Sequence, residues 1–315
     1  MSPSHPEILH NNVKDIARVA ELLRAGGLVG LPTETVYGLA ADARNPQAVA
    51  RIFAAKGRPT FNPLIVHLPD LGSVTQVAEL GAEARVLAEA FWPGPMTLVL
   101  PSRGVVADLV SGGLATIAVR VPAHPLAQQV LKTFGGPIAA PSANPSGQIS
   151  PTMAQHVVNG LSGKIDAVLD AGPCDVGLES TILAPGPDGL RLLREGGIAR
   201  EQIEAVAGPL TSDLTPGRVE APGQMERHYA TKAPLHLGGI PQPGEISVGF
   251  GPGSADMTLS DTGDLTQAAA NLFAILHQAD ALATERNASG IRIASIPETG
   301  LGAAINDRLR RAAIR

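Results

Sequence analysis

Short apolar segments that end at proline, glycine or a polar residue are the feature that most constrains the fold of this 315-residue chain. Apolar runs of about 4–8 residues bounded by turn residues are typical of buried strands. These predicted strands span 28–31, 63–68, 96–100, 116–121, 137–140, 167–169, 180–183 and 190–193. The chain is therefore expected to form a sheet from many short strands.

Amphipathic helical segments lie between these strands. Residues 14–25 place apolar side chains on one helical face, and two glycines follow them. Asn45 and Pro46 are typical of an N-cap and a first helical turn, and predict a helix through Lys56. Further helices are predicted over 82–91, 125–134 and 152–161. Because helices and strands are interspersed without a regular β–α–β order, we expect an α/β fold with an open, twisted, mixed sheet.

The pattern divides the chain into three parts. Residues 12–200 carry the predicted sheet, and residues 201–234 form a linker in which proline and glycine interrupt a polar stretch. Residues 235–315 are predicted to form a small C-terminal α/β domain of the Rossmann-like kind. Its elements are strands over 245–250 and 291–296 and helices over 265–283 and 302–313.

Composition excludes several classes of protein. The net charge is −5 and aromatic residues make up 3% of the chain, which disfavours binding of nucleic acid through an overall positive field or a base-stacking surface. Cys174 is the single cysteine, so an internal disulfide or a zinc cluster is excluded. The N-terminal residues do not resemble a signal peptide, and no apolar stretch is long enough to cross a bilayer. We expect a cytoplasmic protein with no membrane partner.

Polar side chains gather at the ends of the predicted strands. Loops converge at strand ends in open α/β sheets, and ligands bind there. Lys56 and Arg58 flank Gly57, where backbone and two cations can approach a phosphate together. The other candidates are hydroxyl, amide and basic residues suited to a polar ligand, namely Thr33, Glu34, Thr35, Tyr37, Asn62, His67, Thr116, Arg120, Ser142, Asn144, Ser180, Thr181 and Arg194. The sequence therefore predicts a cleft for a phosphate-bearing ligand.

Each candidate also has a purely structural interpretation. Lys56 and Arg58 could complement the dipole of the preceding helix, and His67 could be a core histidine. Glu179 is expected to face solvent or to play a structural part. No Walker A sequence, no complete dinucleotide-binding glycine motif and no metalloprotease or serine-hydrolase motif is present.

Four strings together resemble one known family. They are Pro32-Thr-Glu-Thr-Val-Tyr-Gly-Leu39, Lys56-Gly-Arg-Pro-Thr-Phe-Asn-Pro-Leu64, Pro141-Ser-Ala-Asn144, and Ser180-Thr181 with Arg194. Their order and spacing are similar to those of the YrdC-like threonylcarbamoyl-AMP synthases over about residues 12–200. The linker string from Ala221 to Ala230 and the last domain resemble the longer, two-domain members. The resemblance implies an open α/β fold with a large concave cavity.

The resemblance also implies substrates and site residues. L-Threonine, bicarbonate and ATP would give threonylcarbamoyl-AMP and pyrophosphate, the first step in forming threonylcarbamoyl-adenosine on tRNA. Mg²⁺ would arrive with ATP, with no metal site of the protein's own, and Lys56 and Arg58 would act on the phosphates. The threonine side would comprise Thr35, His67, Arg120, Ala140 and Ser180. The ATP side would comprise Arg58, Asn62, Thr116, Ser142, Ser150, Arg194 and Tyr229, the last on a linker that would serve as an active-site lid.

The linker departs from the family pattern at two positions, because Ala221 replaces a serine and Thr231 replaces a proline. The expected partner is a downstream tRNA threonylcarbamoyl transferase complex, and a weak contact with RNA is left open. One alternative is a non-catalytic module that binds double-stranded RNA or tRNA. Another is a carbamoyl-transfer protein of hydrogenase maturation, which the lack of further cysteines disfavours.

Overall fold

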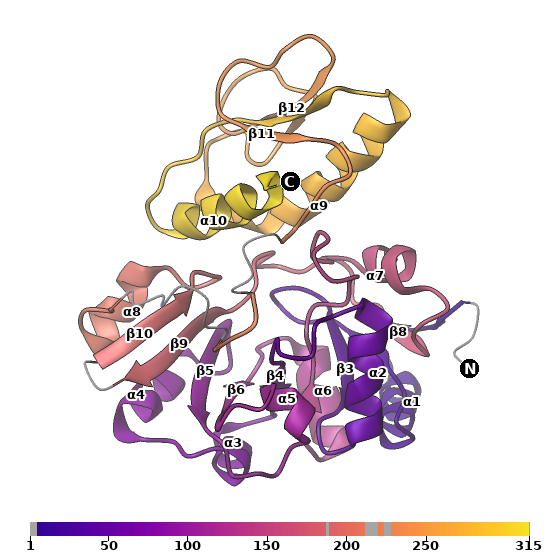
Figure 1. The fold of residues 1–315 in the computed structure, drawn as a ribbon, viewed down its shortest axis with the longest axis vertical. Coiled ribbons are helices and arrows are strands. Elements are labelled where there is room, and N and C mark those ends of the chain that lie inside the picture. The colour runs from indigo at the N-terminus through magenta and orange to yellow at the C-terminus, as the bar shows by residue number, and fades with distance from the viewer. Residues whose placement is uncertain (1–4, 187–188, 212–219, 224–227, 315) are drawn as a thin grey trace.

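The computed structural model describes residues 5–186, 189–211, 220–223 and 228–314, arranged as a large domain with a smaller one beside it (Figure 1). The large domain is built on a ten-stranded sheet. In spatial order its strands are β1 (Glu7–Leu9), β8 (Ala167–Leu169), β2 (Val29–Leu31), β3 (Gly38–Asp42), β7 (Ile138–Ala139), β4 (Ile65–His67), β6 (Thr116–Arg120), β5 (Met96–Pro101), β9 (Thr181–Gly186) and β10 (Gly189–Arg194). Strand β6 runs parallel to β4 and antiparallel to β5, which confirms the predicted mixed sheet.

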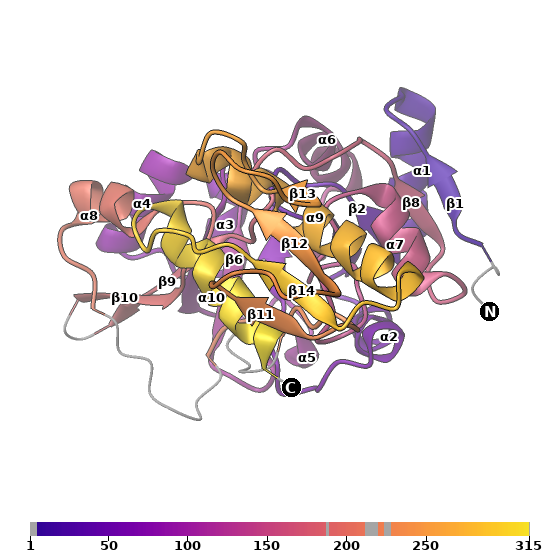
Figure 2. The same cartoon turned by 90° about the horizontal axis from the view of Figure 1, so that it is seen from above.

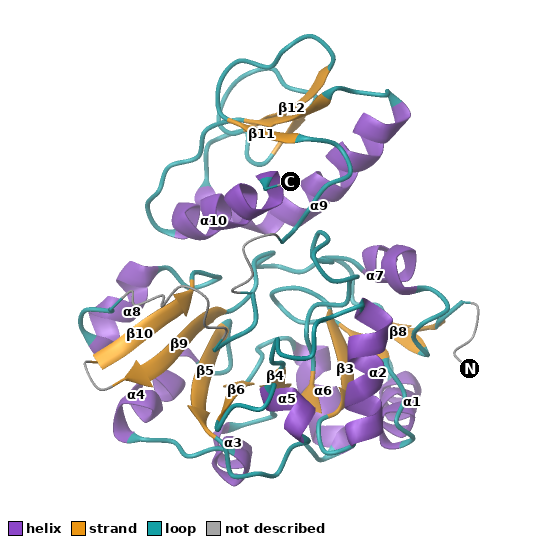
Figure 3. Ribbon diagram, viewed as in Figure 1, coloured by secondary structure: helices purple, strands orange, loops and turns teal. Residues whose placement is uncertain are grey.

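Helices cover this sheet on two faces (Figure 3). They are α1 (Val13–Arg24), α2 (Pro46–Lys56), α3 (Leu71–Val77), α4 (Ala82–Phe91), α5 (Asp108–Ser111), α6 (Pro125–Phe134), α7 (Ala154–Leu161) and α8 (Arg200–Ala207). Helices α1 and α6 share one apolar core with Val29 and Leu31 of β2, whereas α2, α4 and α7 belong to another core with Leu39 of β3. Alternate residues of neighbouring strands thus face opposite layers.

Helix α2 shows how the sequence sets the local geometry of the site. Asn45 caps the helix, since its side-chain oxygen accepts hydrogen bonds from the backbone amides of Gln47 and Ala48. Gly57 ends the helix with a left-handed φ of 61°, a conformation that favours glycine. The predicted helix through Lys56 is confirmed, and its end directs Lys56 toward the loop after β7 and Arg58 toward the loop before β4.

The small domain is a parallel α/β unit. Its four-stranded sheet has the order β11 (Leu235–Leu237), β14 (Gly290–Ile293), β12 (Glu245–Gly249) and β13 (Met257–Thr258), with every neighbouring pair parallel. Helices α9 (Leu265–Glu285) and α10 (Leu301–Ala313) lie between this sheet and the large domain (Figures 1 and 2). The sequence pattern missed β11 and β13, because neither is a buried apolar run: two of the three residues of β11 are exposed and both residues of β13 are half-buried.

The two domains share an apolar interface. Val36, Ile149 and Leu178 of the large domain belong to the same buried cluster as Phe273 of α9. At Gly177, an added Cβ would lie 2.4 Å from the backbone oxygen of Ala269 in α9, so the loop before β9 rests directly on that helix. The small domain is therefore packed against the loop that leads into β9.

Within the described residues no helix is long and apolar enough to cross a membrane. Part of the predicted linker, residues 212–219 and 224–227, lies outside the described residues. The described portion between these gaps includes Ala221, which packs in an apolar cluster with Ile65, Ala118 and Leu193 on the face of the sheet beside the pocket.

Candidate active site

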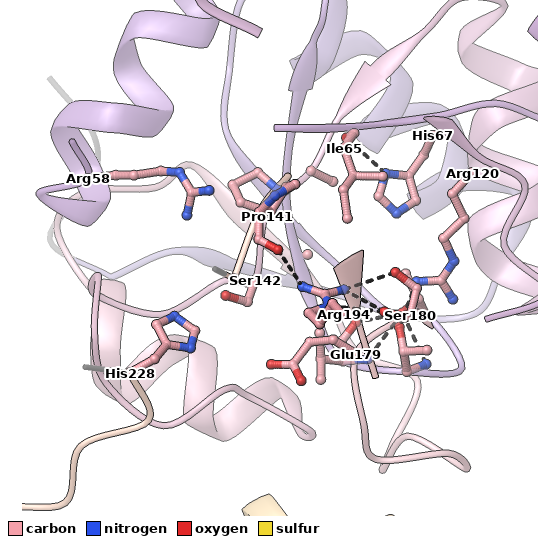
Figure 4. Close-up of a pocket in the computed structure, with 17 residues that line it drawn as sticks. Arg58, Ile65, His67, Arg120, Pro141, Ser142, Glu179, Ser180, Arg194 and His228 are labelled. Atoms are coloured by element: carbon pink, nitrogen blue, oxygen red, sulfur yellow. Dashed lines mark hydrogen bonds between the residues drawn. The ribbon is translucent and has the colours of Figure 1, made fainter. Parts of the chain in front are cut away.

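A pocket opens where β4, β6 and β10 end near the described linker residues (Figure 4), with about 550 Å³ of empty space that extends into open solvent. The lining residues are Thr33, Thr35, Val36, Gly38, Arg58, Ile65, His67, Arg120, Ala140, Pro141, Ser142, Glu179, Ser180, Arg194, Pro222, Gly223 and His228. Nine of the candidates named from the sequence are among them, namely Thr33, Thr35, Arg58, His67, Arg120, Ala140, Ser142, Ser180 and Arg194.

Arg120 forms one wall of the pocket. Its guanidinium Nη1 donates to Thr35 Oγ1 at 2.8 Å, Nε donates to the carbonyl of Gly94 at 3.2 Å, and Nη2 lies 2.6 Å from Glu34 Oε1. Burial by itself raises the pKa of Glu34, but the charge of Arg120 and a hydrogen bond from the Ala123 amide outweigh it, so the pKa lies below its ordinary value. Arg120 faces the pocket while Glu34 lies behind it.

His67 lies beside Arg120, because the parallel register of β4 and β6 pairs these two residues. Its Nδ1 is 3.2 Å from the carbonyl oxygen of Ile65. A carbonyl only accepts hydrogen bonds, so Nδ1 carries the proton and Nε2 is left as an acceptor. Burial and the charge of Arg120 lower the pKa of His67 to about 3. The Arg120 wall, made of Arg120, Thr35 and His67, therefore offers a cation, a hydroxyl and a neutral imidazole.

Arg194 lies beside Ser180 in the pocket (Figure 4). It donates to the Ser180 carbonyl from Nε at 3.1 Å and from Nη2 at 2.7 Å, and Nη2 also lies 3.0 Å from Ser180 Oγ. Nη1 donates to the carbonyl of Pro222 in the linker at 3.2 Å. Burial lowers the pKa of Arg194 to about 10, although Glu179 opposes the shift. This buried guanidinium would gain from an anionic ligand.

Arg58 extends from the end of α2 toward the same space. Its Nη2 donates to Asn62 Oδ1 at 2.7 Å and to the Pro63 carbonyl at 2.8 Å, which fixes the side chain against the following loop. Burial and the charge of Arg194 lower the pKa of Arg58 to about 9. Asn62 is buried behind Arg58 and does not line the pocket.

Lys56 is buried beneath the pocket and is not among its lining residues. Its Nζ donates to the carbonyls of Ser142 at 2.5 Å and Asn144 at 2.6 Å, which ties the loop after β7 to the end of α2. Burial and the charge of Arg58 hold the pKa of Lys56 well below its ordinary value. Ser142 lines the pocket, so Lys56 shapes the site through this loop.

Glu179 is buried in the pocket wall, so of the two interpretations predicted for it, solvent-facing or structural, the solvent-facing one is wrong. Its Oε1 accepts from Ser150 Oγ at 2.6 Å, and its Oε2 accepts from Arg308 Nε of the small domain at 3.1 Å. Burial alone would raise the pKa of Glu179, but the charges of Arg308 and Arg194 lower it to about 2. This carboxylate therefore stays ionised near neutral pH.

Besides Lys56 and Asn62, three more residues predicted to bind ATP lie away from the pocket lining. Thr116 begins β6, four residues before Arg120 and so about 13 Å along the strand. Ser150 is buried behind Glu179. Tyr229 is buried in the small-domain core, where its ring stacks on Phe273 at 5.2 Å, and its backbone has an unusual φ of 63°. The neighbouring His228 lines the pocket in its place.

Sequence reasoning missed Glu179, His228 and Arg308. Glu179 and Arg308 are 129 residues apart, so no local spacing connects them. The signal that could have indicated His228 is its place in the linker string, one residue before Tyr229. Within the described residues, no cluster of three or more histidine, cysteine, aspartate or glutamate side chains could hold a metal ion.

The fold and the pocket together define an α/β protein whose buried arginines and hydroxyls suit a small anionic ligand. A family model described as "Telomere recombination", of the Sua5, YciO and YrdC proteins, matches residues 21–196. A second model, "Threonylcarbamoyl-AMP synthase, C-terminal domain", matches residues 198–314. The chain belongs to the threonylcarbamoyl-AMP synthase family, in the form that carries both domains, and is an enzyme of the transferase class.

Curated relatives match along nearly the whole chain. Threonylcarbamoyl-AMP synthase of Bacillus subtilis is 42% identical, over 97% of this chain and 94% of its own length. The Pyrococcus abyssi enzyme of the same name is 40% identical, over 93% of this chain and 92% of its own length. The crystal structure of P. abyssi Sua5 complexed with L-threonine superposes with a TM-score of 0.89 and 38% identity, covering 98% of this chain and 97% of the other.

Proposed function

We propose that this protein converts L-threonine, bicarbonate and ATP into threonylcarbamoyl-AMP and pyrophosphate. The observation that carries the proposal is a single pocket with two unlike sides. Arg120, Thr35 and His67 form a compact wall suited to an amino acid, whereas the half-buried Arg58 and the buried Arg194 supply two further cations to the same pocket, suited to a polyphosphate. The threonine complex of the P. abyssi relative supports the first half of this assignment.

On the threonine side, Arg120 is proposed to bind the carboxylate of the substrate. Thr35 would contact the same end, because its hydroxyl already accepts from Arg120. The free Nε2 of His67 would accept a hydrogen bond from the amino or hydroxyl group of threonine. The Ala140 backbone and Ser180 would complete the subsite, since both line the pocket.

On the nucleotide side, Arg58 and Arg194 are proposed to bind phosphate oxygens, with the Ser142 loop next to them. Lys56 would act by holding that loop through the carbonyls of Ser142 and Asn144. Asn62 would position Arg58. The remaining predicted ATP residues, Thr116, Ser150 and Tyr229, would act from outside the lining seen here, with Tyr229 in the linker that we propose as a lid.

The proposed chemistry has two steps. The neutral amine of threonine attacks carbon dioxide derived from bicarbonate, forms a C–N bond and loses a proton, which gives a carbamate. A carbamate oxygen then attacks the α-phosphorus of ATP, and the bond to the β-phosphate oxygen breaks to release pyrophosphate. Such a displacement depends on positioning and charge stabilisation more than on a strong base. A pocket of arginines and hydroxyls fits that requirement.

The described pocket residues do not form a protein-only site for Mg²⁺. The carboxylates nearest the pocket, Glu34 and Glu179, are already paired with Arg120 and Arg308. We therefore expect Mg²⁺ to enter as its complex with ATP. The product, a reactive mixed anhydride, would pass to a tRNA threonylcarbamoyl transferase complex, and we expect both to operate in the cytoplasm.

Pyrophosphate release from ATP tests this proposal, with threonine and bicarbonate each omitted in turn. Release that requires both substrates is the expected result. ATP turnover that ignores threonine would contradict the assigned acceptor. Absence of turnover, together with salt-sensitive binding of RNA, would instead favour a nucleic-acid-binding module.

A further inference from the structure

The small domain contributes a charged residue to the base of the pocket. Arg308, in α10, is completely buried and crosses the domain interface to reach the carboxylate of Glu179. A second ion pair, between Arg308 Nη1 and Asp307 Oδ2 at 3.1 Å, and a ring contact with Tyr229 at 5.9 Å hold the guanidinium in place. The side chain is thus fixed by its own domain on one side and by Glu179 on the other.

Glu179 occupies an unfavourable position for a pocket that binds phosphates. Its carboxylate lines the same space as Arg194 and His228 (Figure 4). An ionised carboxylate there would repel an anionic ligand and would also attract the nearby Arg194 guanidinium. Without another cation, Glu179 would therefore reduce the positive potential that Arg58 and Arg194 supply.

The backbone carbonyl of Glu179 is held by the chain segment that follows β10. An added Cβ at Gly196 would lie 2.4 Å from the carbonyl oxygen of Glu179, so the two chain segments are in direct contact. The Gly197 amide donates to that same carbonyl at 2.9 Å. Only the side-chain torsions of Glu179 remain to decide whether its charge points to Ser150 and Arg308 or into the pocket.

We propose that Arg308 is a positioning residue, which holds the Glu179 carboxylate against Ser150 and neutralises it, so that Arg58 and Arg194 remain available to the polyphosphate of the nucleotide. The inference rests on the proposed function, because it concerns the nucleotide subsite. It assigns the small domain a part in substrate binding. Docking of α10 would complete the electrostatics of a pocket that belongs mostly to the large domain.

The linker is fastened to the same helix. Arg311 of α10 donates from Nη1 to the carbonyl of Gly223 at 2.9 Å, and its own carbonyl accepts from the His228 amide at 3.4 Å. Both Gly223 and His228 line the pocket. Because Asp307 pairs with Arg311 as well as with Arg308, one turn of α10 supports both the linker and Glu179.

Neutralising each partner of the ion pair in turn, in the full chain, separates this role from a role in which the ion pair only holds the two domains together. Arg308→Met keeps most of the side-chain volume but leaves the buried carboxylate without its cation. ATP binding, measured by calorimetry, is expected to weaken by about tenfold or more. The KM for ATP should rise in parallel, while the KM for threonine changes less than about twofold because the Arg120 wall is unaffected. Arg310→Met, an exposed residue of the same helix, is the matched control and should bind ATP like the wild type.

Glu179→Gln removes the charge but keeps an acceptor for Ser150. This variant is expected to bind ATP as tightly as the wild type or more tightly. The double variant Glu179→Gln/Arg308→Met should recover affinity to within about threefold of wild type, because no unpaired carboxylate remains. Loss of affinity in Glu179→Gln equal to that in Arg308→Met would overturn the proposal, since ion-pair adhesion alone predicts equal losses. A higher KM for threonine in Glu179→Gln would also overturn it, because Glu179 would then bind the substrate ammonium itself.

Two further outcomes are decisive. If Arg308→Met fails to fold, the double variant still tests the proposal, because it should fold and bind ATP normally. A folded double variant with poor ATP affinity would contradict the proposal. Wild-type protein that binds ATP but releases no pyrophosphate with threonine would contradict the proposed function alone. The order of ATP affinities among the variants would then still test the role of Arg308.

Discussion

The pocket contains two buried carboxylate–arginine pairs that are arranged in opposite ways. In the pair Glu34–Arg120, the arginine faces the pocket and the carboxylate lies behind it. In the pair Glu179–Arg308, the carboxylate lines the pocket and the arginine lies behind it, in the other domain. The first pair presents a cation to the ligand, whereas the second presents an anion whose charge is offset from outside the large domain.

This difference separates what the large domain can do alone from what needs the small one. The Arg120 wall is complete within the large domain, so its geometry should not depend on how α10 is docked. The wall that contains Glu179 and Arg194 depends on Arg308, and also on Pro222 of the linker, whose carbonyl accepts from Arg194. Disturbing the domain interface should therefore affect the nucleotide side more than the threonine side.

The largest effect is expected for Arg120→Met. The substitution removes the proposed ligand of the threonine carboxylate and leaves Glu34 buried without its cation, which typically costs about 3–5 kcal/mol of unfolding free energy. Denaturant unfolding measures the loss of stability, and pyrophosphate release should fall below detection. Arg85→Met, a half-exposed arginine of α4 with a single surface ion pair, is the control and should behave like wild type. A stable Arg120→Met protein with normal threonine KM would show that the Arg120 wall has been misassigned.

Lys56 and Arg58 offer a second test, because they belong to the same side of the pocket but differ in burial. Arg58→Met should leave folding intact and raise the activation barrier by roughly 2.7–4 kcal/mol, by analogy with the loss of one preorganised donor. Lys56→Met should lower both activity and stability, because the carbonyls of Ser142 and Asn144 lose their donor. Turnover and thermal unfolding of both variants give the comparison. Equal stability of the two proteins would contradict the supporting role given to Lys56.

The sequence predicted the helices and strands of the large domain better than the hydrogen bonds and ion pairs of its pocket. Asn45 and Pro46 specified the start of α2 by local chemistry, and the apolar runs located β4, β5 and β6 within one or two residues. Local signals of this kind survive in the folded chain because caps and strand periodicity act over a few residues. Strand β1, with only three residues at the sheet edge, gave no such signal.

The partners of buried charges could not be predicted in the same way. Glu179 has no sequence neighbour that explains its burial, because its cation comes from α10, at the far end of the chain. The position of Tyr229 could not be predicted for the same reason. Its place in the small-domain core depends on contact with Phe273 and on a left-handed backbone conformation that residues other than glycine rarely adopt. Tertiary contacts, which no periodicity encodes, decide both cases.

A change at Gly177 should disturb one wall of the pocket and spare the other. In Gly177→Ala the new Cβ would meet the backbone of α9 at 2.4–2.5 Å, and the residue has a left-handed φ of 71°. The expected result is a loss of about 1–3 kcal/mol in unfolding free energy, with a raised KM for ATP and a nearly unchanged KM for threonine. Gly163→Ala is the matched control, because its φ of 76° imposes similar strain while its Cβ would meet nothing within 4 Å. Equal changes in both KM values would mean that the two walls are not independent.

The last test concerns the protonation of His67, which belongs to the Arg120 wall and has its effect only at acid pH. Its pKa of about 3 in the folded protein lies below the ordinary value of 6.5, so the folded state keeps the ring neutral where the unfolded chain binds a proton. Its contribution to stability is therefore complete above about pH 6.5 and is lost as the pH falls from there toward 3, by at most about 1.4 kcal/mol per pH unit. Unfolding free energies measured between pH 7 and 4 should fall less steeply in His67→Gln, by the equivalent of one proton, than in the wild type. His10→Gln, at an exposed position, should retain the wild-type slope. An unchanged slope in His67→Gln would mean that the imidazole is protonated inside the folded pocket, and the Arg120 wall would then present two cations to the substrate carboxylate instead of one.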